Sequence, residues 1–123
     1  MVVKTKRIYD DVNNEDGIRI LVDRIWPRGV SKEKAKLDCW LKNIAPLNEL
    51  RKYFGHKKDK FNVCKEGYKQ ELNSEEALES YNILKEVIFS TNKNVTLLYA
   101  AKDETYNNAQ ILMEMVTEEQ VFQ

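Results

Sequence analysis

The feature that most constrains the fold is a run of seven residues, 95–101, that is almost free of polar side chains. A polar turn segment, residues 91–94, precedes the run, and Lys102 opens a charged segment after it. A strand with one face in water alternates apolar and polar residues, whereas a continuous apolar strand is covered on both faces. The run therefore predicts the central strand of an α/β sheet.

Two shorter segments near the amino terminus also have strand character. Residues 2–9 are rich in β-branched and aromatic side chains, residues 10–17 form a polar turn that ends in Asp-Gly, and residues 18–22 form a second apolar segment. The connection is too short for a helical crossover between parallel neighbours. We expect these two strands to be either antiparallel neighbours or not adjacent.

Helical spacing characterises most of the remaining chain. Ser31 is placed as the N-cap of a helix whose inner face carries Leu37, Trp40, Leu41 and Ile44. A second short helix is expected from Pro46 to Gly55, where proline suits the first turn and glycine the end. Apolar stripes in residues 61–72 and 77–88 predict an antiparallel pair of longer helices.

A last helix is expected after Asn107 and Asn108, whose side chains suit a cap. We therefore predict a single α/β domain over residues 1–123, with a small, mostly parallel sheet of about three strands surrounded by five or six helices. The inward positions of the periodic segments predict one core. Its expected members are Leu84, Ile88, Leu97, Leu98, Leu112 and Trp40.

Charge and hydropathy exclude several classes of protein. Twenty Lys and Arg balance twenty Asp and Glu, so the broad basic field that non-specific nucleic-acid binding needs is missing and nucleic acid is an unlikely partner. The amino terminus lacks a signal-peptide pattern, and no apolar segment approaches the roughly 18 residues of a membrane span. We expect a cytoplasmic protein without a membrane partner.

Motifs for common cofactors and nucleophiles are not recognised in the sequence. Cys39 and Cys64 have neither zinc-ligand nor thioredoxin-like spacing, and we interpret both as small buried thiols. No metal site is predicted, although carboxylate-bound magnesium stays open. The chain has no Gly-rich phosphate loop and no nucleophile motif. The sequence therefore identifies neither a cofactor nor an oligomeric state.

Two strands end in sudden clusters of charge, which is where ligands bind in open α/β sheets. Residues 18–22 are followed by Asp23, Arg24, Trp26 and Arg28, and residues 95–101 by Lys102, Asp103 and Glu104. Both clusters lead into helix amino termini, at Ser31 and Asn108, whose free N–H groups attract anions. If the strands are parallel neighbours, the clusters meet and form an anion pocket.

A structural interpretation of the same residues is equally consistent with the sequence. Asp23 could pair with an arginine, Arg28 and Lys102 could be solvated, and Trp26 could plug one end of the core. His56, the only histidine, follows Gly55 at an expected helix end, where an imidazolium can cap carbonyl groups or act as an acid in a site.

Three stretches of the chain resemble a known family. GIRILVDRIWPRGVSKEKAKLDCWLKNIAP, ELRKYFGH and VTLLYAAKDETYNNAQIL are similar to the YeaO-like branch of the bacterial proteins grouped as domain of unknown function 488. The resemblance implies a small intracellular α/β protein. It also implies a set of family positions: Asp23, Arg24, Trp26, Pro27, Arg28, Gly29, Trp40, His56, Lys102, Asp103 and Asn107.

This resemblance favours His56 as a member of the site. The chain departs from the family pattern at Tyr106, where histidine is usual, and at Tyr53, where tryptophan is common. A phenol with a pKa near ~10 is a poor base at neutral pH, so a mechanism that needs an imidazole at position 106 does not fit this chain.

The leading hypothesis is a pocket for a small anionic ligand, phosphorylated or nucleotide-like, in a protein that could be an enzyme. Asp23, His56 and Asp103 are the candidate catalytic residues. The candidate ligand-binding residues are Arg24, Trp26, Arg28, Lys102, Tyr106, Asn107 and Asn108. The alternative is a non-catalytic binding or regulatory module that uses the same surface for an anion, a protein or a nucleic acid.

Overall fold

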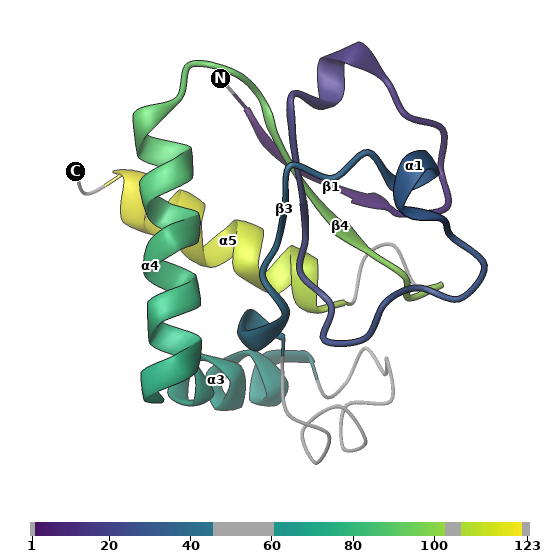
Figure 1. Cartoon of the computed structure of the whole chain (residues 1–123). Helices are drawn as coiled ribbons and strands as arrows, with labels where there is room; N and C mark the ends of the chain where they lie inside the picture. Colours follow the sequence, from purple (N-terminus) through teal and green to yellow (C-terminus); the bar gives the residue numbers. More distant parts are fainter. Residues whose placement is uncertain (1, 46–60, 103–106, 122–123) are drawn as a thin grey trace.

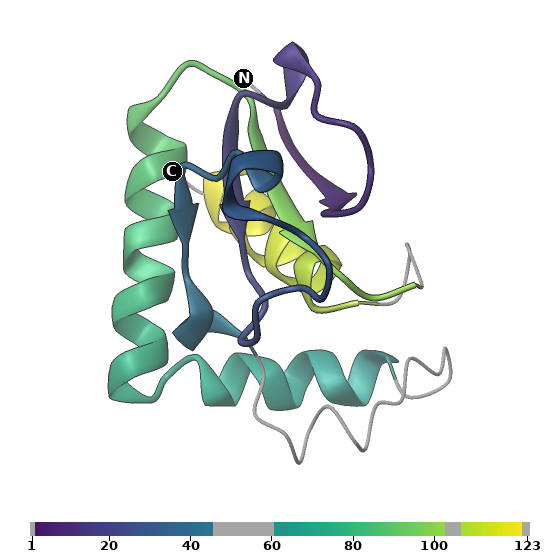
Figure 2. The same ribbon diagram turned by 45° about the vertical axis from the view of Figure 1, so that its right-hand side comes forward.

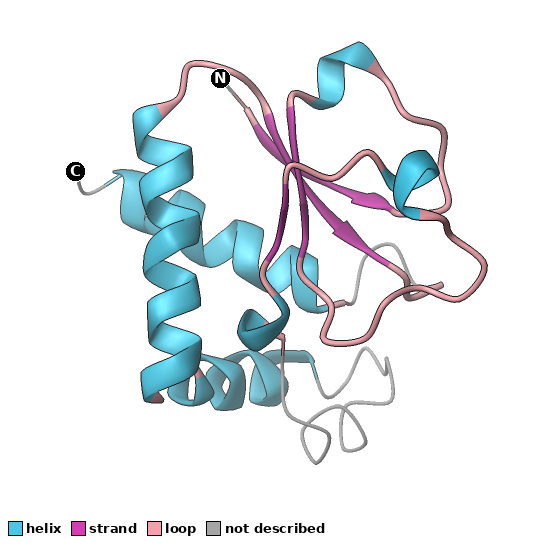
Figure 3. Ribbon diagram, viewed as in Figure 1, coloured by secondary structure: helices cyan, strands magenta, loops and turns pink. Residues whose placement is uncertain are grey.

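The chain folds around a parallel sheet of four strands. The computed structural model describes residues 2–45, 61–102 and 107–121. Strands β1 (Val3–Arg7), β2 (Ile18–Leu21), β3 (Cys39–Trp40) and β4 (Val95–Tyr99) lie in the order β1-β4-β2-β3. All neighbouring strands are parallel (Figures 1 and 3). The predicted α/β class with a parallel sheet is confirmed.

Strand β4 lies inside the sheet, as its apolar sequence predicts. Every residue of β4 is buried, and β4 pairs with β1 on one side and with β2 on the other. Strands β1 and β2 are therefore not adjacent, which decides between the two arrangements left open by the sequence. The short connection between them passes across β4 instead of reversing the chain into a hairpin.

The helices described by the structure cover the sheet unequally. Helices α3 (Phe61–Glu71), α4 (Glu75–Ser90) and α5 (Asn108–Val121) lie on one side, and the single-turn helix α1 (Lys32–Ala35) lies on the other (Figure 1). The described residues also contain two short 3-10 helices, η1 (Asn14–Asp16) and η2 (Lys42–Ile44). The described residues thus contain four α-helices and four strands, where about three strands and five or six helices were expected.

Helices α3 and α4 match their predicted positions but not their predicted packing. Figure 2 shows α3 crossing the amino-terminal end of α4 instead of running alongside it. The turn between them is tight, because the N–H groups of Asn73 and Ser74 donate to carbonyl groups in the last turn of α3. The expected antiparallel pair is therefore wrong, and α3 lies below the carboxyl ends of the strands.

The sheet separates two apolar clusters. Ile20 and Leu97 point to the side of α4 and α5, where they pack with Leu84, Ile88 and Leu112. Leu21 and Leu98, one position along each strand, point to the opposite side and pack with Ile8 and Ala35. The five aliphatic core residues predicted from the sequence are fully buried, but they belong to two clusters because successive strand residues face opposite ways.

The helix predicted from Ser31 through Ile44 is wrong beyond its first turn. Ser31 does cap α1, with its Oγ accepting the Lys34 N–H at 3.1 Å. The helix ends at Lys36, which adopts the left-handed conformation with φ of 46°. The chain then forms the edge strand β3, so Trp40 is 37% exposed instead of buried in the core. The second predicted helix, residues 46–55, lies outside the described residues.

Candidate functional site

The loops that follow β2 and β4 meet at the carboxyl end of the sheet, as predicted for parallel neighbours. The Asp23 carboxylate accepts the Ala100 N–H at 2.8 Å. Its other oxygen lies 3.4 Å from the side-chain nitrogen of Asn108, which also donates to the Val22 carbonyl at 3.0 Å. Asp23 thereby ties the β2 loop to the β4 loop and to the start of α5.

Arg7 holds the same β4 loop from the side of β1. Its Nε donates to the Ala101 carbonyl at 2.9 Å, and its Nη2 donates to the Ala100 carbonyl at 3.3 Å. The guanidinium also lies 5.1 Å from the centre of the Tyr9 ring. The sequence analysis did not select Arg7, because a basic residue at the end of an alternating strand has the pattern of a solvated side chain.

The two asparagines at the start of α5 have different tasks. Asn107 is fully buried, and its Oδ1 accepts the Gln110 N–H at 2.9 Å, which caps the helix as expected. Asn108 is half-buried and directed to Asp23 and Val22. These contacts fix the loop geometry, and the ligand-binding role expected for both residues stays a prediction.

Arg24 is the residue at this edge whose polar groups are least satisfied. Its side chain is half-buried, and its Nη2 donates to the Ala45 carbonyl at 3.0 Å. Among the described residues, its Nε is the one buried side-chain nitrogen or oxygen without a hydrogen-bond partner. Buried N–H groups are rarely left unpaired, because desolvation without a hydrogen bond costs roughly 1–3 kcal/mol. Among the described residues, the buried Nε–H of Arg24 therefore has no acceptor.

Tyr68 of α3 is a buried residue near Asp23 and Arg24. It is 1% exposed, and its hydroxyl donates to the carbonyl of Ile44. Burial raises its pKa well above the usual value, and the carboxylates of Glu71 and Asp23 add to this shift while Arg24 opposes it. Tyr68 thus remains a neutral donor. The sequence placed it on an apolar helix stripe, without a signal for this position near Arg24.

The two tryptophans form a joined pair beside Asp23. Their ring centres are 5.4 Å apart with planes at 70°, an edge-to-face contact. The Trp26 indole N–H donates to the Val30 carbonyl at 2.6 Å, and the Trp40 N–H donates to the Asp23 carbonyl at 2.7 Å. The ammonium of Lys42 lies 5.8 Å from the centre of the Trp40 ring. Both indoles are held in place, and Trp40 faces solvent.

Arg28 and Arg24 contact residues near different strands. Arg28 is exposed, and its carbonyl accepts the Tyr9 hydroxyl at 3.0 Å, just beyond β1. Arg24 is anchored to Ala45, which follows β3. Strands β1 and β3 are opposite edges of the sheet.

Lys102 is likewise exposed and, within the described parts of the chain, forms no ion pair. The contact of Arg24, Arg28 and Lys102 with one anion stays a prediction. His56, Asp103 and Tyr106 lie outside the described residues.

A cavity elsewhere in the molecule contains none of the predicted site residues. It has a volume of about 410 Å³ and lies between α3, α4 and α5, where Leu72, Tyr81 and Met115 line it together with Lys69 and Lys85. Its place on the helical side separates it from the loops that follow β2 and β4. The cavity therefore gives no support to the predicted anion site.

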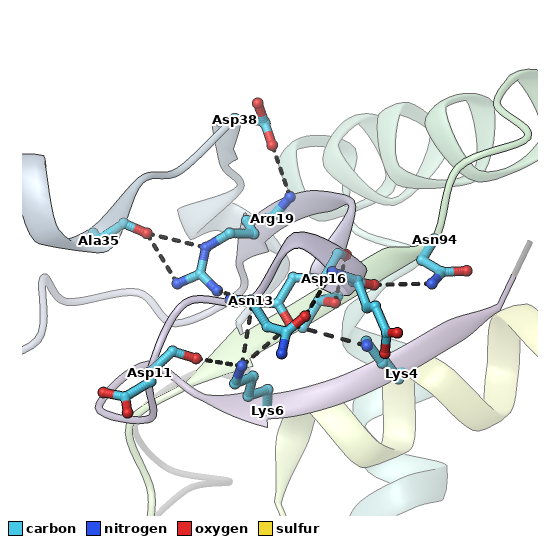
Figure 4. A network of polar contacts seen from close by, with 11 residues as sticks. Lys4, Lys6, Asp11, Asn13, Asp16, Arg19, Ala35, Asp38 and Asn94 are labelled. Carbon is cyan, nitrogen blue, oxygen red and sulfur yellow. Dashed lines mark hydrogen bonds and ion pairs between the residues drawn. The ribbon is translucent and has the colours of Figure 1, made fainter.

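A second polar cluster, which the sequence analysis missed, lies near the amino ends of the strands (Figure 4). Arg19 and Asp16 are 3% and 1% exposed, and they form an ion pair of 2.6 Å. Arg19 also donates twice to the Ala35 carbonyl, while Asp16 accepts from Lys6 at 3.2 Å. Thr96 donates to the Asp16 carbonyl at 2.7 Å. Because each partner is satisfied within the chain, this cluster has the character of scaffolding.

The described ranges 2–45, 61–102 and 107–121 contain neither a metal-binding group nor a membrane-spanning helix. No group of three or more His, Cys, Asp or Glu side chains is arranged to hold a metal ion there. None of the helices in these ranges has the length and apolar character needed to cross a membrane.

Burial raises the pKa of the half-buried Cys39 thiol, and the neighbouring Asp38 adds to this effect. A raised pKa disfavours the reactive thiolate.

Comparison with known proteins adds a family to this geometry. Residues 2–122 match the family model DUF488-N3i, described as the inactive DUF488-N3 subclade. The chain belongs to this family. The uncharacterized protein YeaO of Escherichia coli (strain K12) is 40% identical over 116 residues, which cover 93% of this chain and 96% of YeaO. The YeaO-like resemblance seen in the sequence is therefore confirmed.

Two mycobacterial relatives match over a shorter part of the chain. The uncharacterized proteins Rv3073c of Mycobacterium tuberculosis (strain ATCC 25618 / H37Rv) and Mb3100c of Mycobacterium bovis (strain ATCC BAA-935 / AF2122/97) are each 40% identical over 76 residues. These residues cover 62% of this chain and 64% of each relative. No solved structure matches the chain.

Proposed function

We propose that this protein is a non-catalytic binding module that takes a small anion at the carboxyl end of its sheet, with Arg24 as the central contact. The observation that carries the proposal is the buried Nε of Arg24, which has no hydrogen-bond partner among the described residues. An anion that displaces the groups covering Nε would accept from it and from the remaining guanidinium N–H groups. Charge-assisted hydrogen bonds of this kind are short and strong.

The surroundings of Arg24 support an anion as the ligand. The Nη2 contact with Ala45 fixes the guanidinium on one side, and the hydroxyl of Tyr68 is already engaged with Ile44. The nearby carboxylate of Asp23 is engaged with Ala100 and Asn108. Arg24 therefore contributes positive charge and donors to this place, which is what a phosphate or carboxylate needs.

The family description supports binding without catalysis. The subclade that the chain matches is described as inactive, and Asp23 is engaged in fixing two loops. The catalytic roles expected for Asp23, His56 and Asp103 are not part of this proposal. A protein or nucleic-acid partner on the same surface stays a prediction.

The test is a calorimetric titration with inorganic phosphate and with sulfate. Arg24→Lys keeps the charge but removes the planar fork and the Nε–H, so affinity should fall by about tenfold or more, a change equivalent to about 1.4 kcal/mol. Arg28→Lys makes the same chemical change at the β1 side of the loop and should have a smaller effect. Equal affinity in the wild type and Arg24→Lys, or no binding by the wild type, would contradict the proposal.

A further inference from the structure

The exposed indole of Trp40 lies next to the site proposed for the anion. The Trp40 N–H donates to the carbonyl of Asp23, the residue directly before Arg24. Arg24 in turn donates to Ala45, which ends the 3-10 helix that begins at Lys42. An indole ring, a guanidinium and an ammonium are therefore gathered where the β2 loop passes the end of β3.

Trp40 has the properties of a preorganised aromatic platform. It is 37% exposed, yet its N–H is bonded to Asp23 and its ring packs edge-to-face with Trp26. A ring fixed in this way loses little conformational freedom when a ligand packs on it. The β3 strand that carries Trp40 consists of two residues at the edge of the sheet, and burial within the core does not explain its position.

The contact between Lys42 and Trp40 shows which ligand chemistry suits the platform. The ammonium lies 5.8 Å from the ring centre, close to the ~6 Å limit for a cation–π contact, and the contact is weak because Lys42 is exposed. A flat aromatic ring can take the place of this ammonium on the indole. The displaced Lys42 can then pair with a negative group on the same ligand. A cationic ligand would be repelled by Arg24 and Lys42, and an aliphatic anion would gain little from the indole.

Resting on the proposed anion site at Arg24, we infer that the ligand is a nucleoside phosphate, whose phosphate contacts Arg24 and Lys42 and whose base stacks on Trp40. A free mononucleotide suits the surface better than a nucleic-acid strand. A strand requires a groove of cations along its backbone, whereas the chain carries equal numbers of basic and acidic residues.

The test compares four probes by calorimetry on the full chain: adenosine monophosphate, adenosine, inorganic phosphate and a single-stranded adenine oligonucleotide. We expect the mononucleotide to bind at least about tenfold more tightly than phosphate, as stacking on an aromatic side chain implies. Adenosine should bind more weakly than the mononucleotide. Both tryptophans of the chain belong to this cluster, so mononucleotide binding should also quench the intrinsic fluorescence.

Variants of Trp40 test base stacking separately from anion binding at Arg24. Trp40→Leu should reduce mononucleotide affinity about tenfold, to the level of phosphate, and Trp40→Phe should restore part of the loss. Phe89→Leu alters another partly exposed aromatic residue, on α4, and should change nothing. If Trp40→Leu does not fold, the affinities of the wild type for the mononucleotide and for phosphate still test whether the base contributes to binding.

Four outcomes would overturn the inference. Equal affinities for phosphate and mononucleotide, or an unchanged mononucleotide affinity in Trp40→Leu, would reject the stacking role while leaving the anion site intact. Much tighter binding of the oligonucleotide would make a strand the ligand. Binding of neither phosphate nor mononucleotide would reject the anion site itself.

Discussion

Two arginines on strand β2 and the loop after it, Arg19 and Arg24, differ in how their donors are used. Arg19 is almost fully buried, and its Nε, Nη1 and Nη2 all have partners in Ala35 and Asp16. Arg24 is more exposed as a residue, yet its Nε is buried and has no partner among the described residues. The more deeply buried guanidinium is thus the better satisfied one.

This difference separates a scaffold residue, Arg19, from the residue of the proposed site, Arg24. A buried charge is tolerated in a stable fold when hydrogen bonds and an opposite charge compensate its desolvation, and Asp16 and Ala35 provide both for Arg19. A buried donor left without a partner lowers stability, and such groups occur where a ligand supplies the missing acceptor. On this account the polar cluster at the amino end of the sheet stabilises the fold, and binding is proposed for the carboxyl end.

The largest effect is expected from Arg19→Met. The substitution leaves the buried Asp16 carboxylate without its closest partner, at 2.6 Å in the native chain. Breaking one side of a buried ion pair typically costs about 3–5 kcal/mol. Urea unfolding measures the loss, with Arg28→Met as the control, because substitution of an exposed arginine changes stability by no more than about 0.5 kcal/mol. A loss below about 1 kcal/mol for Arg19→Met would remove the scaffold role.

A loss of about 2 kcal/mol in unfolding free energy is expected for Asp23→Ala, because hydrogen bonds to charged groups contribute about 1.5–3 kcal/mol. The substitution leaves the Ala100 N–H without its acceptor and removes the longer of the two contacts of Asn108, whose bond to the Val22 carbonyl remains. Asp10→Ala, at an exposed position after β1, is the control for the same measurement. Equal stability of the two variants would mean that Asp23 does not fasten the loops, and a catalytic role for it would become the better explanation.

A smaller effect is expected on the pH dependence of stability. Burial by itself raises the pKa of Asp16, but hydrogen bonds from Asn13, Lys6 and Arg19 and the charge of Lys6 hold it below the usual 3.8. A carboxyl whose pKa is lower in the folded state stabilises the fold above its unfolded pKa. This contribution is lost as the pH falls below about 4 and through the folded pKa.

Urea unfolding midpoints at several acidic pH values measure this effect. The wild type should lose more stability between neutral and acidic pH than Asp16→Asn, which has no proton to gain at this position. Parallel pH profiles for the two proteins would show that Asp16 is not stabilised as an anion by its neighbours.

Strong local patterns made much of the fold predictable. The continuous apolar run at β4 and the apolar stripes of α3 and α4 are local patterns that predict these elements. The parallel pairing of β2 with β4 brought the loops after the two strands together as expected. Strand β3 was missed because Trp40 and Leu41 lie at helical spacing from Leu37, and a two-residue strand has no period of its own. The left-handed residue that ends α1 is Lys36, so the glycine that commonly marks a helix end is absent.

The polar clusters were harder to predict because their partners are distant in sequence. Asp16 meets Lys6 and Thr96, and Arg19 meets Ala35, only through the folded sheet. A charged residue within a short strand was not recognised as part of a buried network. The charge cluster after β2 was found, and the joint contact of its residues with one ligand stays a prediction. No local pattern encodes the contact of Arg24 with Ala45 or that of the Arg28 carbonyl with Tyr9.

The most direct test of the contrast between the two arginines is the unfolding free energy of the wild type and Arg24→Met, each measured with and without inorganic phosphate at about 100 times its dissociation constant for the wild type. Without phosphate, Arg24→Met should be within about 1 kcal/mol of the wild type, because an apolar side chain removes an unpaired donor. Phosphate should stabilise the wild type by about 2.7 kcal/mol and leave Arg24→Met unchanged. Equal stabilisation of both proteins by phosphate, or a loss in Arg24→Met as large as that in Arg19→Met, would contradict the account.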